Sequence, residues 1–233
     1  MILLLDERQR KELAQYSPYI AIPKVSSQNR RYIPMDYLEG EIIPGDKLFT
    51  MPSATSYEFG ILMSNVHMAW TRAVCGRLKS DYSYSNMIVY NNFPWPSPTN
   101  DQKEKIRKTA QAILNARACL KKAFRELRVP VCGRFYPNEG GVAGYGNRMR
   151  VKYTAKWGLQ IAEMIFQTRS RALYTDSNLA DLYDPLTMPT ELLKAHKANN
   201  RAVMHAYGFS IKMSEADCVA ELMRMYQKLT KEK

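Results

Sequence analysis

The chain has 233 residues, of which 45% are hydrophobic and 24% carry a charge. This composition is sufficient for a buried core in one large domain or two small ones, and it excludes a low-complexity or fibrous chain. The net charge of +12 favours a polyanionic partner, either nucleic acid or an anionic membrane surface, over a chain that is merely basic and soluble.

The cysteines and the N-terminus narrow the expected location of the protein. The four cysteines are scattered and form no Cys-x-x-Cys pair, which favours reduced thiols in a cytoplasm. The short apolar start turns at once to Asp6, and no apolar run approaches the length of a transmembrane helix. A membrane partner is therefore supported by charge alone, and we expect none.

The first half of the chain has a mixed pattern of helix and strand. β-Branched and aromatic residues predict strands, and clusters of Ser, Asn, Gly and Pro predict the turns between them. The elements predicted before residue 55 are, in chain order, a short helix from Asp6 to about Gln15, a strand at 19–25, a basic loop at 26–31, an extended segment at 31–34 that forms a hairpin, a turn at 44–46 and a strand at 47–51.

A helical pattern begins at Ser56. Apolar residues then recur at helical spacing, and Gly76 is a natural stop. Residues 86–90 favour a strand. Three closely spaced prolines end the segment, because proline lacks a donor and restrains its predecessor. We place a domain boundary near residues 97–100.

The second half of the chain is mainly helical. The predicted helices run from an Asn100 cap to about Leu127, from 154 to 173, from Pro189 to Gly208, and onward from a capping-box-like start at Ser214–Asp217. Residues 129–150, rich in glycine and arginine, interrupt the pattern. The elements therefore predict an α+β fold, with a small mixed α/β domain at 1–98 and a mainly helical domain at 99–233.

A search for a catalytic centre finds no convincing candidate. The glycine-rich run at 140–146 follows no clear apolar strand, so we interpret it as a loop rather than a phosphate cradle. Residues 91–95 contain the groups of the amino-methyltransferase motif in the wrong order. Asp101–Lys103 has the acid-x-Lys spacing of nucleases, but it lies in a predicted first helical turn where the dipole alone favours an acid. The histidines have no metal-ligand spacing, and His67 is expected to pack in a core.

Two clusters combine cations, hydroxyls and aromatic rings. The first surrounds the loop at 24–31, and the second extends from Gly76 to Pro96. Cations and hydroxyls hold phosphates, Arg can form two hydrogen bonds with guanine, and aromatic rings stack on bases. The candidate residues for nucleic-acid contact are Lys24, Ser26, Ser27, Arg30, Arg31, Arg77, Lys79, Asp81 and Ser83.

Strand alternation in the second cluster would place Asp81, Ser83 and Ser85 on one face, where short polar groups can meet base edges. The tyrosines between them would point to the opposite face. A buried tyrosine pair with a wet polar face explains this alternation equally well, and an ordinary solvated loop explains the residues at 24–31. Both alternatives stay open at the level of these residues.

Three longer blocks carry a family resemblance. The blocks are Tyr19 to Leu38, with Ile-Pro-Lys-Val-Ser-Ser-Gln-Asn-Arg-Arg-Tyr-Ile-Pro-Met at its centre, Gly60 to Pro96, and Leu179 to Tyr207, which opens Leu-Ala-Asp-Leu-Tyr-Asp-Pro-Leu-Thr-Met-Pro. Together they resemble the target-recognition domain and the helical C-terminal segment of MmeI-like (type IIL) restriction–modification enzymes, a resemblance that covers most of the chain.

The resemblance implies a function and partners. It implies sequence-specific recognition of double-stranded DNA, which positions an adenine for N6 methylation by a catalytic region, in cis or in trans, that is absent from this chain. In the family a nuclease that cleaves the DNA often accompanies that region, and whether one does here stays open. S-adenosylmethionine is the cofactor implied for that region, none is expected here, and a bacterial cytoplasm is the implied location. In the family, side chains around a Tyr-x-Tyr-Ser segment help to select a base pair, which implies such a role for Asp81 and Ser83. Because Ser83 stands where a longer charged residue is expected, its readout is expected to be weak or water-mediated.

One segment departs from the family pattern. An insertion at about 119–170 separates an Ala-Arg-Ala helix end from Arg171. Its cations suit an additional DNA-contacting arm, and a helical hairpin with a loose tip explains it equally well. The alternative function for the whole chain is a protein-interaction module that docks on a methyltransferase without reading DNA.

Overall fold

The computed structural model describes residues 18–38, 45–126, 181–185 and 188–231. The predicted helices at 6–15 and 154–173 and the glycine-rich run lie outside these residues. A compact unit joins residues up to Arg117 with residues from Asn178 onward, and its small antiparallel sheets and helices confirm the α+β fold. The predicted domain boundary near residues 97–100 stays a prediction.

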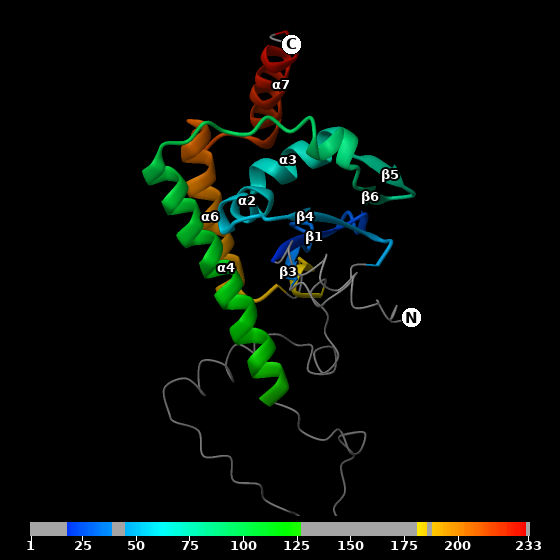
Figure 1. Ribbon diagram of the computed structural model, residues 1–233, viewed down its shortest axis with the longest axis vertical. Coiled ribbons are helices and arrows are strands. Elements are labelled where there is room, and N and C mark those ends of the chain that lie inside the picture. Colours follow the sequence, from blue (N-terminus) through cyan, green and yellow to red (C-terminus); the bar gives the residue numbers. More distant parts are fainter. Residues whose placement is uncertain (1–17, 39–44, 127–180, 186–187, 232–233) are drawn as a thin grey trace, which may run out of the picture. The chain divides into compact units, whose positions relative to one another are not determined.

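The first of two three-stranded antiparallel sheets is built around β1 (Tyr19–Pro23). This strand lies between β3 (Asp36–Leu38) and β4 (Leu48–Pro52). The predicted hairpin forms, but its second strand is at 36–38 instead of the extended segment predicted at 31–34. Ile20, which is fully buried, pairs with residues of both neighbours. The sheet thus supplies one wall of the core (Figure 1).

The second sheet joins segments that lie about fifty residues apart in the sequence. Its central strand is β6 (Asp81–Ser83), which pairs with β2 (Val25–Ser26) on one side and β5 (Gly76–Leu78) on the other. Residue Lys24 separates β1 from β2, so one continuous segment contributes to both sheets.

The helical stretch after Ser56 differs from the predicted single helix, because it forms two helices. α2 (Ser56–Leu62) begins at a capping box in which Thr55 and Glu58 satisfy each other's backbone ends. Ser64 then caps α3 (Asn65–Val74), accepting a hydrogen bond from the backbone N–H of His67 at 3.2 Å. A serine that caps a new helix interrupts the first one, although the apolar spacing continues across it.

The predicted strand at 86–90 is wrong, because these residues form the short π-helix η1 (Asn86–Tyr90). The Oγ of Ser85 caps it by accepting from the backbone N–H of Ile88 at 3.3 Å. The indole N–H of Trp70 donates to the carbonyl oxygen of Val89 at 2.9 Å, which ties the turn to α3. This tertiary contact outweighs the strand propensity of Ile88 and Val89.

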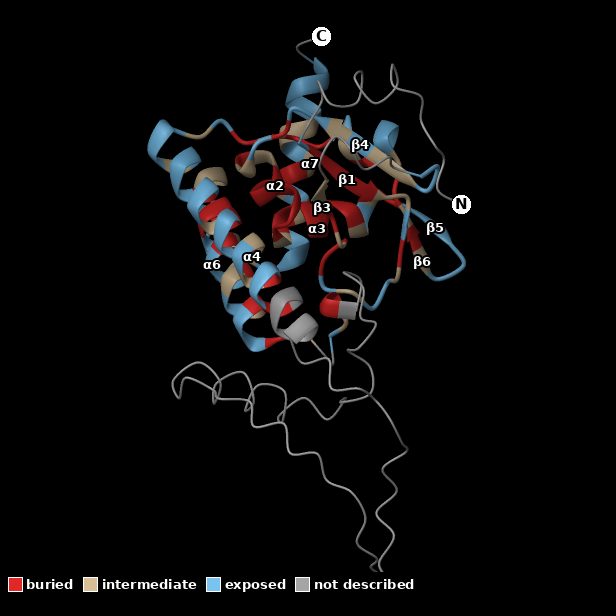
Figure 2. Ribbon diagram, turned by 60° about the horizontal axis from the view of Figure 1, so that its bottom comes forward, coloured by how far each residue is buried: buried red, intermediate tan, exposed pale blue. Residues whose placement is uncertain are grey.

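Long helices pack against α2 and α3 and complete the core. α4 (Asn100–Glu126) and α6 (Thr190–Tyr207) lie side by side, and α7 (Glu215–Lys231) contacts α3 through the rings of Tyr226 and Trp70. A short 3-10 turn, η2 (Asp181–Tyr183), precedes α6. Figure 2 shows buried residues concentrated in β1, α2 and α3.

The ends of α4 and α6 lie where the sequence predicted them, except that the residue that caps α4 is one position earlier. Thr99, rather than Asn100, caps α4, because its hydroxyl accepts from the backbone N–H of Gln102 at 3.3 Å. Pro189 precedes α6, and Gly208 ends that helix in the left-handed region at φ 71°, as predicted. Among the described residues, no helix is long and apolar enough to cross a bilayer.

Candidate nucleic-acid interface

The pairing of β2 with β6 brings the two sequence-predicted clusters into one sheet. Ser26 of the first cluster pairs with Tyr82 of the second, and the backbone N–H of Tyr84 donates to the carbonyl oxygen of Lys24 at 2.8 Å. All nine candidate residues therefore lie on this sheet or on the loops that leave it.

The inner side of the sheet is packed. Tyr82 and Tyr84 are each 3% exposed, as the alternation predicted. The hydroxyl of Tyr84 lies 3.0 Å from Nε2 of His67, and the ring of Phe93 contacts His67 edge-on. Burial lowers the pKa of His67 to about 3, so this histidine is neutral and holds the strand in place. The predicted packing role of His67 agrees with this geometry.

The opposite side of the sheet, which we call the outer face, is open to solvent. Residues directly paired in an antiparallel sheet point to the same side, and alternate residues share a face. The register pairs Ser83 with Val25 and Gly76, and it pairs Asp81 with Leu78. The outer face therefore consists of Val25, Gly76, Leu78, Asp81 and Ser83. Asp81 and Ser83 are half-buried, whereas the other three are exposed.

Ser85 does not join this face, although strict alternation predicted that it would. The strand β6 ends at Ser83, and the hydroxyl of Ser85 is used as the cap of η1. The polar side chains of the outer face are thus those of Asp81 and Ser83.

Two cations of the second cluster lie on the β5–β6 hairpin. Arg77 pairs with Tyr82, so its side chain leaves the strand on the side of that ring, opposite to Asp81 and Ser83. The guanidinium of Arg77 stacks over the ring of Tyr82 at 4.1 Å and donates to the carbonyl oxygen of Ser80 at 3.3 Å. Lys79 lies in the hairpin turn with a positive φ of 56° and is exposed. Arg77 has a fixed direction because of the stacking, and its remaining N–H groups are available to an anion.

The first cluster separates into an exposed part and a buried part. Arg31 is exposed, whereas Arg30 is half-buried, and its Nη1 donates to Oγ of Ser26 at 3.4 Å. Ser26 is only 2% exposed. The structure therefore gives Ser26 a role in positioning Arg30, instead of the exposed hydroxyl that the sequence predicted.

Ser27 and Lys24 are half-buried at the edges of this cluster. The hydroxyl of Ser27 accepts from the backbone N–H of Asn29 at 3.4 Å, which shapes the loop. The ammonium of Lys24 lies 5.0 Å from the ring centre of Phe49, over its face. Both side chains are thus partly accessible to solvent.

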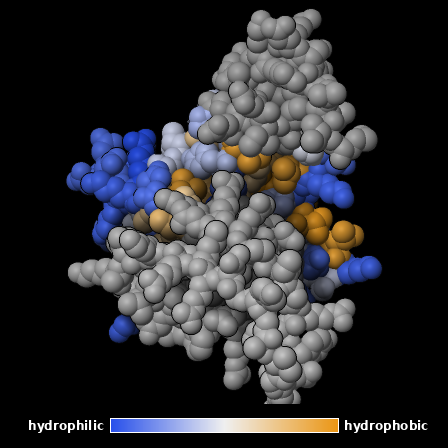
Figure 3. Space-filling model, turned by 90° about the horizontal axis from the view of Figure 1, so that it is seen from below, coloured by the Kyte–Doolittle hydropathy of each residue, from blue (hydrophilic) through white to orange (hydrophobic). Residues whose placement is uncertain are grey.

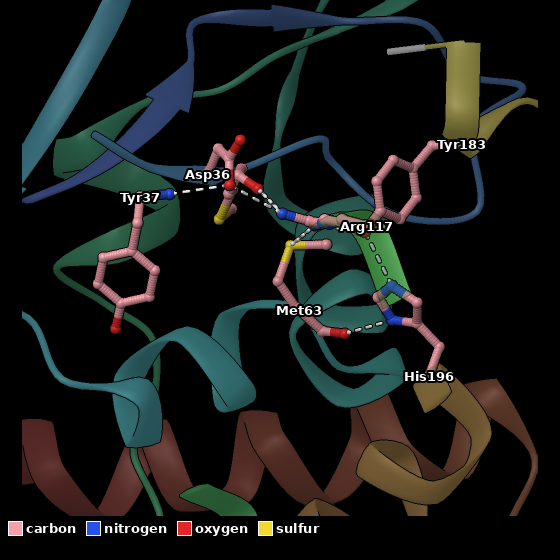
Figure 4. Close-up of polar contacts among 7 residues, drawn as sticks. Asp36, Tyr37, Met63, Arg117, Tyr183 and His196 are labelled. Carbon is pink, nitrogen blue, oxygen red and sulfur yellow. Dashed lines mark hydrogen bonds and ion pairs between the residues drawn. The ribbon is translucent and has the colours of Figure 1, made fainter. Parts of the chain in front are cut away.

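A buried polar network that the sequence did not predict lies elsewhere in the same unit (Figure 4). Arg117 is 2% exposed, yet it donates to the carbonyl oxygen of Met35 at 2.7 Å and pairs with Asp36 at 3.3 Å. Its Nε also donates to the hydroxyl of Tyr183 at 2.8 Å. These partners lie 66 to 82 residues away, so no local pattern could reveal them.

The network continues to His196. The Tyr183 hydroxyl lies 2.9 Å from Nε2 of His196, and Nδ1 lies 3.2 Å from the carbonyl oxygen of Met63. Because that carbonyl can only accept, Nδ1 carries the proton and Nε2 accepts from Tyr183. Burial raises the pKa of Tyr183 to about 12, and burial together with Arg117 lowers that of His196 to about 3. Every member is partnered inside the core, which fits a network that holds β3 against α4 and α6.

Neither region has the groups of a metal-dependent active centre. Within the described ranges, no three side chains from His, Cys, Asp or Glu lie close enough to hold a metal ion. The outer face can accept or donate hydrogen bonds through the side chains of Asp81 and Ser83.

The comparisons with known proteins agree on one family. Residues 5–97 match the family described as "MmeI, target recognition domain", and residues 159–232 match "MmeI, C-terminal domain". Residues 120–178 match a "Family of unknown function (DUF6783)", which overlaps most of the predicted insertion.

Two longer proteins are similar over nearly the whole chain. DNA methyltransferase A of Bacillus subtilis (strain 168) is 30% identical over 223 residues, covering 96% of this chain and 19% of the relative. The solved structure of the type IIL restriction-modification enzyme MmeI in complex with DNA is 34% identical, with a TM-score of 0.65, covering 93% of this chain and 22% of that one. The chain therefore spans about a fifth of the length of the relatives it matches. The predicted resemblance is confirmed: the chain belongs to the MmeI-like family, with a target recognition domain followed by a C-terminal domain.

Proposed function

We propose that this chain is the module of a restriction–modification enzyme that recognises a specific sequence of double-stranded DNA. The observation that carries the proposal is the pairing of β2 with β6, which brings cations from two distant segments to one small sheet whose open face carries Asp81 and Ser83. A target recognition domain match over the same residues, and similarity to an enzyme solved in complex with DNA, support it.

We assign phosphate contacts and base contacts to different residues. The exposed cations Arg31 and Lys79, together with the stacked Arg77, hold phosphates and set the register of the duplex. Asp81 on the outer face accepts from a cytosine amino group, and the Ser83 hydroxyl donates to or accepts from a neighbouring base edge. Ser26 acts indirectly by fixing Arg30.

The chemistry belongs to a separate catalytic region, acting in cis or in trans. Enzymes that methylate a base in a duplex extrude it from the stack, so a module that holds the flanking sequence has a physical purpose. The glycines of the described residues, at 45, 60, 76 and 208, form no glycine-rich turn between a strand and a helix, so these residues do not fit S-adenosylmethionine. We assign that cofactor and adenine N6 methylation to the catalytic region.

The experiment is a salt series of duplex binding by the 233-residue chain, measured by fluorescence anisotropy. Arg31→Ala is expected to weaken binding to all sequences and to reduce the salt slope by about 0.9, because one phosphate contact is lost. Arg224→Ala, which removes an exposed cation of α7 paired with Glu221, is the matched control and should leave the slope unchanged.

A base-preference assay completes the test. Asp81→Ala should change the sequence selected from randomised duplexes more than it changes total affinity, because we assign to Asp81 a contact with a base edge. Failure of the unmodified chain to bind any duplex at low salt would contradict DNA recognition. Retained binding to a methyltransferase core in that case would support the docking module instead.

A further inference from the structure

The outer face carries two exposed apolar side chains beside its polar pair. Leu78 is 58% exposed and Val25 is 45% exposed. Single exposed apolar residues are common on protein surfaces and need no explanation. These two share a face with Asp81 and Ser83, because Leu78 pairs with Asp81 and Val25 pairs with Ser83. Each polar reader thus has an apolar neighbour directly across the strand pair.

No side chain stands at the Gly76 position of the outer face, so the backbone there is accessible to solvent. Gly76, which also pairs with Ser83, has no side chain, and a Cβ added there would meet nothing closer than the Ser83 carbonyl oxygen at 3.9 Å. Neither space nor backbone conformation requires glycine at this position. The absence of a side chain therefore matters for whatever approaches the outer face from solvent.

The occupant must combine an apolar group with hydrogen-bonding edges and negative charge. Lys79 is exposed in the hairpin turn directly after Leu78, whereas Arg77 lies on the side of Tyr82, so one cation adjoins the apolar side chain at this end of the outer face. Figure 3 shows the same kind of contrast on the described surface, with hydrophobic groups next to strongly hydrophilic ones. Of the four DNA bases, thymine presents a methyl group in the major groove, and that groove admits a β-ribbon.

We propose that Leu78 and Val25 contact the 5-methyl groups of thymines in the major groove, while Asp81 and Ser83 meet the adjacent base edges. This inference rests on the proposed function and deepens it, because it names the base feature that the apolar residues read. The recognised sequence then contains at least one A·T pair opposite the outer face.

The test compares thymine with uracil, which lacks only the methyl group. The sequence recognised by the 233-residue chain is first selected from randomised duplexes, and each thymine in it is then replaced singly by deoxyuridine. At one or two positions the affinity is expected to fall about fourfold, which is the effect of leaving one methyl-sized group unburied. Other thymines should be insensitive.

The variant Leu78→Ala assigns the contact. It is expected to bind the thymine and the uracil duplex equally at one sensitive position, with the affinity of the unmodified chain for uracil. Val25→Ala should do the same at a second position if two methyl groups are read. Ile211→Ala, which truncates a side chain that is 63% exposed outside the sheets, is the control and should keep the full preference for thymine.

A second variant acts by shape. Gly76→Ala adds a methyl group to the outer face, and it is expected to reduce affinity for the selected duplex while the far-ultraviolet circular dichroism and the melting temperature stay unchanged. Normal affinity of this variant would show that DNA does not approach the outer face closely, which overturns the inference.

The outcomes separate the inference from the function on which it rests. Equal affinity for thymine and uracil at every position, or a selected sequence without any A·T pair, overturns the thymine contact and leaves sequence-specific binding standing. A gain in affinity only when cytosine is replaced by 5-methylcytosine assigns the apolar residues to the other methylated base and also overturns it. Loss of all sequence preference in the unmodified chain overturns the proposed function itself.

Discussion

Arg117 shows how one buried residue can hold several distant segments of a core together. Its guanidinium lies in the core with Asp36, Met35 and Tyr183 as partners. Taking such a group out of water costs several kcal/mol, about what its partners return, so the network contributes geometry more than net stability. Removing one member alone has a different effect, because the others keep their burial and lose their partner.

We therefore predict that Arg117→Ala lowers the free energy of unfolding by about 3–5 kcal/mol, because Asp36 loses its ion-pair partner and the buried Met35 carbonyl loses this donor. Arg107→Ala is the control on the same helix, since Arg107 is 47% exposed and forms a surface pair with Glu104, which is worth about 0–1 kcal/mol. Urea unfolding of both variants measures the difference. Equal effects of the two substitutions would show that the buried network contributes no more to stability than a surface ion pair.

The same scale explains which site residues were predictable. The alternation at 81–84 placed both tyrosines inward, because a period of two is a local property of a strand. Ser26 was misjudged, since its burial depends on Tyr82, with which it pairs across more than fifty residues. Leu78 and Val25 were overlooked because isolated apolar residues in a polar segment give no signal until the register is known.

Elements depend on caps and on close approaches that periodicity does not reveal. The stretch from Ser56 to Val74 has continuous helical spacing, yet the cap at Ser64 divides it into α2 and α3. Gly60 marks a position where α2 meets α4 and α6, because a Cβ there would lie 2.7 Å from Ile106 and 3.1 Å from Asn199. The sequence around Gly60 does not indicate this requirement, because it comes from the packing of α2 against α4 and α6.

The variant Gly60→Ala is predicted to destabilise the fold by about 1–3 kcal/mol, as overpacking in a well-packed core does. Improved helix propensity would act in the opposite direction by about 1 kcal/mol, so the net sign reports how far α4 and α6 can move. Gly45→Ala is the matched control, because nothing lies within 4 Å of the added Cβ. Thermal melts of the two variants are compared, and a stabilised Gly60→Ala would rule out the steric constraint.

At the scale of the whole molecule, two buried histidines tie stability to pH. His67 and His196 both have a pKa near 3 in the fold, mainly because burial disfavours the charged ring, against 6.5 when exposed. Each is neutral in the folded state, so the unfolded chain binds more protons as the pH falls below 6.5. Their contribution to stability is complete above pH 6.5 and is lost progressively toward pH 3.

The predicted result is a free energy of unfolding that falls between pH 6.5 and 5 by up to about 1.4 kcal/mol per pH unit for each histidine. This window lies above the range in which ordinary carboxylates titrate. Urea unfolding at several pH values measures the slope. His196→Gln should be less stable at every pH and should show about half the slope, whereas an unchanged slope would mean that His196 is not buried and neutral.

Most individual strands and helices could be predicted from the sequence, whereas the pairing of distant strands could not. Strands at 19–25 and 47–51 and helices from about 100 and 190 follow local patterns that the structure confirms. The pairing of β2 with β6 does not follow from them, because β2 has two residues and carries almost no periodicity. Yet this pairing creates the candidate site, so the least predictable contact of the fold is the one on which the function depends.

Neighbouring residues of β6 tolerate substitution to different degrees, because alternate side chains point inward and outward. Tyr82 packs inward, so substitutions of it lower the stability of the fold. Asp81 and Ser83 face outward and contribute little to the core. Substitutions at outward positions are then nearly free of stability cost and can accumulate by neutral drift. A lineage of such proteins can therefore diverge in the DNA it binds without passing through poorly folded ancestors.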